Sequence, residues 1–382
     1  MVAVRIRAFR SPIASFMVWG LLLGELSHAI TIRVPQDYAT IQDAILWATH
    51  GDVIVVSPGT YVENIDFLGK NVILRSTNPI SSAVVATTII DGNKMRTTVT
   101  FRGSETSSCS LSGFTIWKGL AEQFGGGILG NGTRARIEHN VITWNSAPHG
   151  YGGGLVYCNG TIQNNVITGN SASGVYGASC GGGLCGCNGT IRNNVITGNS
   201  ASGGPYGASC GGGLAYCDGT IQNNTITGNS ADGGGGLFYC GGTIRNNTIY
   251  GNSAWTEGGG FYKCSAVIVN CIIWGNAAPL YSQISYHSIP NYCCIQGYTV
   301  GQGQGNIGSD PRFRSLTDFH LQRGSPCIDA GTNQNCPAFD MDGNRRPLDG
   351  NGDGRAVVDM GAYEFPTVPR SAISHRLWPL YK

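Results

Sequence analysis

Seven side chains with the chemistry of sugar recognition recur at one point of an internal repeat. They stand in the variable loops between repeat units, and they are His149, Tyr151, Tyr176, Tyr206, Asp232, Trp255 and Glu257. Aromatic rings cover sugar faces and carboxylates accept hydrogen bonds from hydroxyl groups, so this set predicts a wall that binds polysaccharide. The competing interpretation is that loops tolerate any residue and that aromatic rings there shield the edge of the fold.

A catalytic use of the same loops would need two carboxylates at a suitable separation for sugar hydrolysis. Asp232 and Glu257, one repeat apart, are the candidates. The repeats hold no Asp-Asp pair and no Arg-x-Lys motif, and no Ser/His/Asp or Cys/His motif is present. We therefore expect a binding or structural protein, with a polysaccharide lyase or glycoside hydrolase as the alternative and a purely mechanical envelope component as a third class.

A short acidic loop near the C-terminus has the start of a calcium-binding motif. Asp349, Asn351 and Asp353 alternate with Gly, which places oxygen ligands on every second residue and allows a sharp turn. The twelfth-position Glu of such loops is missing; Met360 stands there, beside Asp359. The motif predicts a Ca2+ site, and a pair of Asx turns is the alternative.

Fourteen cysteines include a column that repeats with the coils: Cys158, Cys187, Cys217, Cys240 and Cys264. A row of thiolates could bind a soft metal, but the spacing matches no zinc motif, so a buried row of small apolar side chains is the preferred interpretation. Two pairs are expected to be disulfides in exported protein, namely Cys180 with Cys210 and Cys327 with Cys336.

The repeats run from about residue 125 to 277 and close on a Gly-Asn-Ser-Ala-like step. The closing asparagines are Asn145, Asn170, Asn199, Asn229, Asn252 and Asn276. A period in the twenties indicates a solenoid, and short Ile/Val/Thr runs broken by Gly and Asn indicate strands and turns. Matched Ile residues would stack inward about 4.8 Å apart, and a second set of asparagines, Asn165, Asn194, Asn224 and Asn247, would form a hydrogen-bonded ladder ending at Cys271.

The predicted fold is all-β: one right-handed parallel β-helix of about ten to twelve coils. Ile41, Ala44, Ile45 and Ala48 have helical spacing and predict a short helix that covers the N-terminal end. We expect an N-terminal cap with the first coils over residues 30–124, repeat coils over 125–300, a C-terminal cap region over 301–365 and a loose tail over 366–382.

Both ends of this region resemble bacterial secreted β-helix proteins of the pectin-lyase-like superfamily. The N-terminal likeness covers Val34 to about Ile90 and includes Gly51-Asp52 and Pro58-Gly-Thr-Tyr61. The C-terminal likeness is to a "GNI..DP.F" element at residues 305–313, a "GSPCIDAG" element at 324–331, a "D.DG..RP" element at 340–347 and a "D.GAYE" element at 359–364. The resemblance implies the fold and export, and it implies no particular activity.

Residues 1–29 are predicted to be a signal peptide, with Arg5, Arg7 and Arg10 before an apolar run and with Ser27 and Ala29 before the cleavage point. An uncleaved N-terminal anchor is the alternative. Cleavage would lower 24 basic and 22 acidic side chains to 21 of each, which gives no basic field for nucleic acid. We expect a secreted or cell-surface monomer without a further membrane span, whose partner is a polysaccharide.

Overall fold

The computed structural model describes residues 29–174, 181–203, 211–285, 288–299 and 303–366. The predicted signal segment up to residue 28 lies outside these ranges, as do Tyr176, Tyr206, Cys180 and Cys210. No helix among the described residues is long and apolar enough to cross a membrane.

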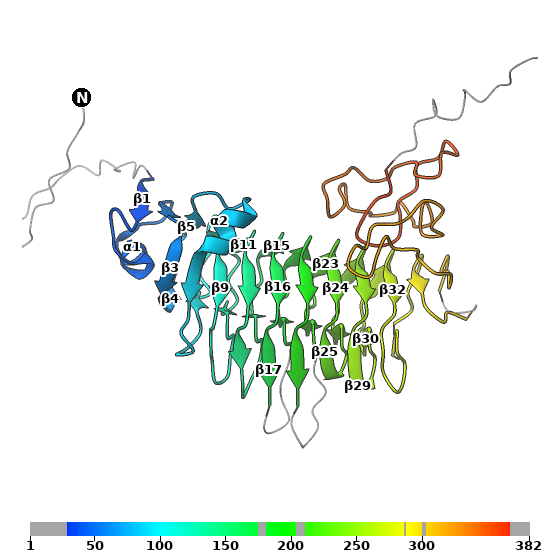
Figure 1. Cartoon of the computed structure of the whole chain (residues 1–382), viewed down its shortest axis with the longest axis horizontal. Coiled ribbons are helices and arrows are strands. Elements are labelled where there is room, and N and C mark those ends of the chain that lie inside the picture. Colours follow the sequence, from blue (N-terminus) through cyan, green and yellow to red (C-terminus); the bar gives the residue numbers. More distant parts are fainter. Residues whose placement is uncertain (1–28, 175–180, 204–210, 286–287, 300–302, 367–382) are drawn as a thin grey trace, which may run out of the picture.

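The chain winds into an elongated stack of coils in which every ladder between neighbouring strands of the four sheets is parallel (Figure 1). Sheet A contains β1 (Thr31–Val34), β2 (Val53–Val56), β5 (Ile73–Ser76), β8 (Ser110–Ser112), β11 (Arg136–Glu138), β15 (Thr161–Gln163), β19 (Thr190–Arg192), β23 (Thr220–Gln222), β27 (Thr243–Arg245) and β31 (Val267–Val269). Sheet B contains β3 (Gly59–Val62), β6 (Thr88–Asp91), β9 (Thr115–Trp117), β12 (Val141–Thr143), β16 (Val166–Thr168), β20 (Val195–Thr197), β24 (Thr225–Thr227), β28 (Thr248–Tyr250), β32 (Ile272–Trp274) and β33 (Cys294–Ile295).

Two further sheets, of eight and five strands, complete part of the coils. Sheet C contains β4 (Ile65–Asp66), β7 (Val99–Thr100), β10 (Ile128–Leu129), β14 (Leu155–Val156), β18 (Leu184–Cys185), β22 (Leu214–Ala215), β26 (Leu237–Phe238) and β30 (Phe261–Tyr262). Sheet D contains β13 (Ser146–Ala147), β17 (Ser171–Ser173), β21 (Ser200–Ser202), β25 (Ser230–Gly233) and β29 (Ser253–Glu257). The expected parallel β-helix is confirmed, and its two longest sheets have ten strands each.

The core of the stack is a set of in-register aliphatic columns. Ile162 pairs with Ile191 in sheet A, and Ile167 pairs with Ile196 in sheet B. All four are buried because the middle residue of each three-residue strand points inward. The same position in each coil therefore contributes to one continuous apolar interior.

Asparagine ladders turn the chain at two corners of each coil. The backbone N–H and the side-chain amide of Asn165 both donate to the side-chain oxygen of Asn194, at 3.0 Å each. The Asn165 side-chain amide also donates to the Ile137 backbone carbonyl. The second ladder links Asn145, Asn170 and Asn199 in the same way. The first ladder ends where Cys271 replaces Asn, as predicted: its last amide-to-amide bond joins Asn224 to Asn247 at 3.0 Å, and the Cys271 N–H donates to the Cys293 sulfur at 3.3 Å.

The predicted N-terminal helix is present as α1 (Ile41–Trp47), with Ile41, Ala44, Ile45 and Ala48 buried. Glu63 accepts the Ile41 and Gln42 N–H groups at its start, and the Lys70 ammonium donates to three carbonyls at its end. Both charges therefore satisfy groups that a helix leaves unpaired at its termini. A second helix, α2 (Ser82–Thr87), precedes β6.

Residues 305–366 pack along the side of the stack, over β23, β24 and β32 (Figure 1). Turn asparagines between sheets A and B hold them: Asn223 donates to the Phe339 carbonyl at 2.7 Å and Asn270 to the Thr332 carbonyl at 2.9 Å. Within this region the described residues form only isolated bridges, such as Phe313 with Leu321. Most of the segment expected as a cap thus contacts the coil wall, whereas Ile307 extends the end of sheet B through a parallel bridge to Cys294.

Candidate functional site

A row of tyrosines projects from the end of sheet C. Tyr157, Tyr216 and Tyr239 occupy the same position in their coils, each with a left-handed backbone (φ 51°, 51° and 48°). This bend turns the chain between the inward Leu155 and the inward Cys158, and it sends the tyrosine outward. The three side chains are 39%, 42% and 40% exposed. We call them the tyrosine row.

The rings of the tyrosine row are held by aromatic contacts. Tyr216 stacks on Tyr239 with ring centroids 5.5 Å apart, and Phe238 meets both rings edge to face. Lys263 takes the next position and lies over the rings of Tyr262 and Tyr239, at 5.0 and 5.7 Å. The row is interrupted once, at Gly186, where an added Cβ would lie 2.7 Å from the Tyr157 ring. Aromatic packing therefore fixes these rings in place although they are half exposed.

A buried apolar cluster lies beneath the tyrosine row. It is formed by the outward residues of sheet C, namely Val156, Cys185, Ala215, Phe238 and Tyr262. Tyr151, one of the predicted site residues, packs against this cluster and stacks on Phe124 at 5.5 Å. Tyr151 therefore belongs to the aromatic surface of sheet C.

A polar row runs beside the tyrosines at the turn from sheet C to sheet A. Asn159 accepts the Asn188 N–H at 2.9 Å, Asn188 accepts the Asp218 N–H at 2.9 Å, and Asp218 accepts the Gly241 N–H at 2.8 Å. Asn188 and Asp218 are exposed. Amide and carboxylate groups therefore stand in register next to half-exposed rings, which is the combination that sugar-binding surfaces use.

His149, Asp232, Trp255 and Glu257 of the predicted loop wall lie along sheet D, in different coils of the stack. His149 follows β13, whereas Trp255 and Glu257 lie in β29, at the other edge of the same five-stranded sheet. Trp255 is 79% exposed. Asp232 lies in β25 next to Glu257, and its carboxylate accepts the Gly203 N–H from the preceding coil. Asp232 thus has a structural contact, and Tyr176 and Tyr206 lie outside the described residues.

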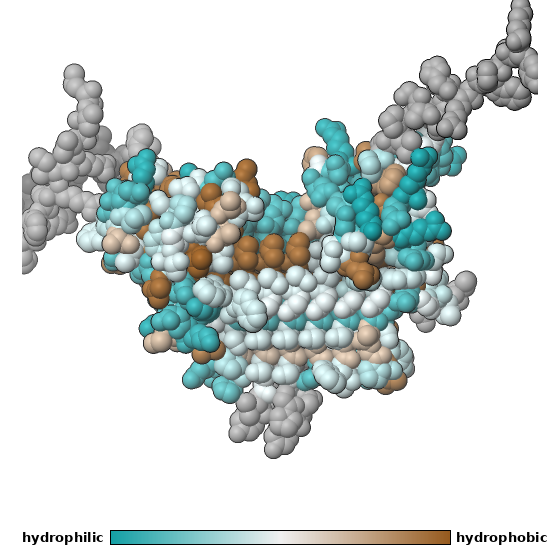
Figure 2. Space-filling model, viewed as in Figure 1, coloured by the Kyte–Doolittle hydropathy of each residue, from teal (hydrophilic) through white to brown (hydrophobic). Residues whose placement is uncertain are grey.

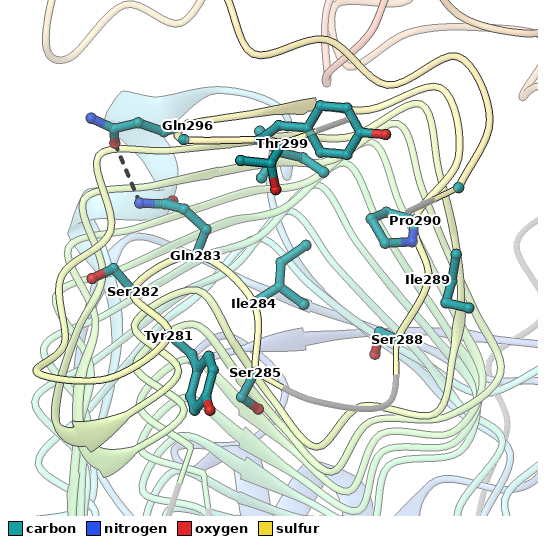
Figure 3. Close-up of a pocket in the computed structure, with 14 residues that line it drawn as sticks. Tyr281, Ser282, Gln283, Ile284, Ser285, Ser288, Ile289, Pro290, Gln296 and Thr299 are labelled. Carbon is teal, nitrogen blue, oxygen red and sulfur yellow. Dashed lines mark hydrogen bonds between the residues drawn. The ribbon is translucent and has the colours of Figure 1, made fainter. Parts of the chain in front are cut away.

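His149 borders a separate small cavity of about 430 Å³ that is lined also by Met95, Arg96 and Glu122. The His149 N–H donates to the Glu122 carbonyl at 3.1 Å. A larger pocket of about 670 Å³ lies where the stack of coils ends, and Figure 3 shows Ile284 and Tyr281 at its wall. No charged side chain lines this larger pocket among the described residues.

The predicted calcium residues form a tight turn. Asp349 accepts the Gly352 N–H at 2.8 Å and the Gly354 N–H at 3.0 Å, and Asn351 accepts the Asp353 N–H at 2.8 Å. Asp329 joins them by accepting the Asn351 N–H at 2.7 Å. Within the described ranges, no group of three or more His, Cys, Asp or Glu side chains is placed to hold a metal ion. Ca2+ binding by Asp349, Asn351 and Asp353 stays a prediction.

The cysteine column is interior. Cys158, Cys187, Cys217, Cys240 and Cys264 are buried in the main core, and the Cys240 N–H donates to the Cys264 sulfur at 3.4 Å. No two of the twelve cysteines that the structure describes are joined by a disulfide bond. Cys327 is therefore not bonded to Cys336 as predicted; its sulfur interacts with that of Cys294, and that contact and burial raise the pKa of the Cys327 thiol.

A histidine in the C-terminal region lies between two carboxylates. His320 interacts through Nδ1 with Asp318 and through Nε2 with Asp342 at 2.7 Å, and its ring stacks on Tyr363 at 4.0 Å. Burial alone favours the neutral ring, but the hydrogen bonds to the two carboxylates raise the pKa of His320. The cluster ties two loops together, and we assign it a structural role.

The tyrosine row went unrecognised in the sequence, although a signal for it exists. An aromatic or basic residue directly precedes the column cysteine in four of five coils, as in Tyr157-Cys158 and Lys263-Cys264. Strict strand alternation does not predict which way such a residue points, because the left-handed bend lies at that residue itself.

Comparisons with known proteins give little beyond the shape of the chain. No family model matches it, and no curated protein matches it. Among solved structures, the crystal structure of pectate lyase Pel9A is similar with a TM-score of 0.47 and 14% identity over 85% of this chain and 91% of that chain. The fold assignment rests on the parallel sheets described above.

Proposed function

We propose that this protein is an exported or cell-surface β-helix that binds polysaccharide through the tyrosine row. The observation that carries the proposal is the in-register row of Tyr157, Tyr216 and Tyr239, half exposed and backed by a buried apolar cluster. Packing already holds these exposed rings in place, so binding costs little side-chain entropy. A ligand that contacts several of the rings at once would gain most from this.

The geometry suits a chain that runs along the stack. Neighbouring coils are about 4.8 Å apart, so a linear polymer meets a ring edge, a hydroxyl or an amide at each step. Tyr216 and Tyr239 offer their edges and hydroxyl groups, because their ring faces contact each other. The polar row of Asn188 and Asp218 adds hydrogen-bonding groups on one side. Affinity would be spread over several weak contacts, with the rings contributing most.

The test is retention of purified protein on a panel of neutral and anionic polysaccharides. Tyr216→Ala with Tyr239→Ala should weaken retention about tenfold or more, which corresponds to about 1.4 kcal/mol or more. Phe339→Ala is the matched control, since Phe339 is an exposed ring (52%) in the C-terminal region. Retention that is equal in the double variant and in wild type would remove the tyrosine row from the proposal.

The same assay separates binding from catalysis. New reducing or unsaturated ends in the polysaccharide would indicate a hydrolase or a lyase. In that case Asp232→Asn with Glu257→Gln should abolish product formation, because these are the adjacent carboxylates of sheet D. We expect no product and little effect of this pair on retention, since the Asp232 carboxylate is bonded to the Gly203 N–H.

A further inference from the structure

A second surface of the stack carries a row of bare glycines. Sheet B is joined to sheet D at a corner where Gly169, Gly198, Gly228, Gly251 and Gly275 occupy equivalent positions. All five have a left-handed backbone, with φ between 60° and 65°. We call them the glycine row.

The backbone conformation does not by itself require glycine there. The corner between sheets A and B has the same left-handed turn, and it carries Asn164, Asn193, Asn223, Asn246 and Asn270 with φ between 50° and 55°. The row itself continues through Trp144 in the preceding coil, whose φ is 54°. Asn and even Trp are therefore accommodated in this turn, although the left-handed region favours Gly.

Lack of space does not require glycine either, except at the last position. A Cβ added at Gly169, Gly198 or Gly228 would have no neighbour closer than 3.7 Å, and one added at Gly251 would have none within 4 Å. Only at Gly275 would it come within 3.0 Å of another atom, in the Tyr250 ring. Four consecutive coils thus have room for a small side chain, although their left-handed backbone favours Gly, and the strip stays uncovered.

Hydroxyl groups border this strip on both sides. One border is Thr143, Thr168, Thr197 and Thr227, and the other is Ser146, Ser171, Ser200, Ser230 and Ser253. Neighbouring hydroxyls bond along each border, Thr227 to Thr197 at 3.1 Å and Ser171 to Ser146 at 3.0 Å. Neither border nor the row between them contains a charged residue, and Figure 2 shows this face as pale bands across the strands.

Aromatic rings stand at both ends of the strip. Trp144 is 71% exposed and its indole lies 3.8 Å from the Cβ position of Gly169. Tyr250 and Trp274 occupy the threonine border at the other end, where the Tyr250 ring packs against Phe313 and Phe319 of the C-terminal region. An exposed indole of this size is costly to leave in water, so it suggests a ligand that covers it.

We infer that the glycine row binds a single extended chain of neutral polysaccharide along the stack. This inference rests on the proposed polysaccharide function and adds a second surface and a ligand class to it. Sugar hydroxyls would bond to the Thr and Ser borders, which both donate and accept. A pyranose ring would lie on Trp144. Acidic polymers are disfavoured because neither the glycine row nor its borders contain a cation that would compensate their carboxylates, and Arg312 lies only at the Tyr250 end. From Gly169 to Gly275 there are four coil steps, or roughly 19 Å.

The decisive variant fills the strip without disturbing the fold. Gly198→Asn with Gly228→Asn places amides in a conformation that Asn193 and Asn223 already adopt in the same coils. The matched control is Gly343→Asn, which also has a positive φ and open space but lies in the C-terminal region. Trp144→Ala is an independent second variant, and thermal unfolding of each protein shows that it is folded.

Binding to insoluble neutral and anionic polysaccharides is measured for wild type, these variants and the tyrosine double variant. We expect the filled strip to weaken binding to the neutral polymer about tenfold, a loss of about 1.4 kcal/mol, with Trp144→Ala also weaker and Gly343→Asn unchanged. Neutral-polymer binding that survives both the filled strip and Trp144→Ala would overturn the inference while leaving the tyrosine row intact. Retention of wild type by no polymer would remove the proposed function and this inference together.

Discussion

The repeat coils bury neutral amides in rows, whereas residues 305–366 bury charged side chains that contact one another. In the coils, Asn194 is fully buried and receives two bonds from Asn165 while donating to Asn224. In the C-terminal region, buried Arg346 lies 3.5 Å from Glu364, and Glu364 accepts the Asp359 N–H. The first arrangement repeats in consecutive coils from Asn140 to Asn247, and the second occurs once among the described residues.

This difference predicts how the stability of each region responds to substitutions and to pH. A solenoid stabilises each coil through its two neighbours, so the loss of one ladder contact stays local. A buried charge cluster depends on all its members, because each remaining charge is uncompensated once its partner is removed. Residues 305–366 should therefore be the more sensitive region, both to single substitutions and to pH.

The largest effect is expected for Arg346→Met. The change removes the guanidinium from Glu364 and from the Gly361 carbonyl, to which it donates at 3.0 Å. Breaking a buried pair by removing one partner costs about 3–5 kcal/mol. Thermal unfolding and limited proteolysis should show early loss of residues 305–366. Arg323→Met, on an exposed side chain, is the control, and equal melting of the two variants would contradict the role given to the charge cluster.

The next effect concerns pH and the same cluster. Burial, with the neighbouring Glu364 charge second, raises the pKa of Asp359 to about 8, and burial raises the pKa of Glu364 to about 7. The folded protein therefore binds more protons than the unfolded chain. This contribution to stability is fully present below the ordinary carboxyl pKa and is lost as pH rises through these values.

The raised pKa of His320 also lowers the stability of the folded protein as pH rises above the ordinary histidine pKa. Melting temperatures should thus fall between pH 5 and pH 8. Asp359→Asn should flatten the slope, because the amide cannot ionise. A wild-type stability that rises over this range would show that other groups dominate.

Replacing a buried ladder asparagine in the coils should cost less stability than Arg346→Met costs in the C-terminal region. Asn194→Ala removes bonds to the Ile162 carbonyl and to Asn224, and leaves the Asn165 donors without their acceptor. Each buried group left unpaired costs about 1–3 kcal/mol, and with local relaxation we expect a total of about 3 kcal/mol. Asn188→Ala, on the exposed polar row, should cost clearly less. A chevron or melting series that ranks the exposed change above the buried one would refute the ladder argument.

The coils could be predicted well from the sequence because the same pattern of buried residues recurs in each repeat. Ile162, Asn165 and Ile167 recur at one spacing in consecutive coils, and a parallel stack is the arrangement that buries all copies alike. The end of the Asn ladder at Cys271 was predicted correctly, because a thiol replaces the side-chain amide there. The direction of Tyr157 depends on a single left-handed residue, which periodicity does not reveal.

The C-terminal region is less predictable for a physical reason. Its motifs were visible, yet nothing periodic brings Asp340, Arg346, Asp359 and Glu364 together. Only the tertiary fold does so, through bonds such as Glu364 N–H to Asp340 at 2.8 Å. The loop wall was predicted from equal positions in the repeat, and Asp232 and Glu257 do lie in paired strands of sheet D. Ligand binding by that wall stays a prediction.

The smallest effect expected is that of calcium on the turn at Asp349. Burial, with the nearby Asp349 charge contributing, raises the pKa of Asp329. A divalent cation would relieve this repulsion and would use carboxylate lone pairs that the Gly352 and Gly354 N–H bonds leave free. At tenfold excess over its dissociation constant, Ca2+ would stabilise the folded protein by about 1.4 kcal/mol.

Melting with excess Ca2+ should therefore occur at a higher temperature than with chelator, and Asp349→Asn with Asp353→Asn should remove the difference. Asp37→Asn is the control, because that carboxylate lies at the N-terminal end and accepts the Arg33 N–H. If wild type melts equally in chelator and in Ca2+, the backbone bonds account for the loop fully, and Asp349, Asn351 and Asp353 form Asx turns without a metal. The charged region would then be held by its internal pairs alone, which strengthens the contrast with the neutral coils.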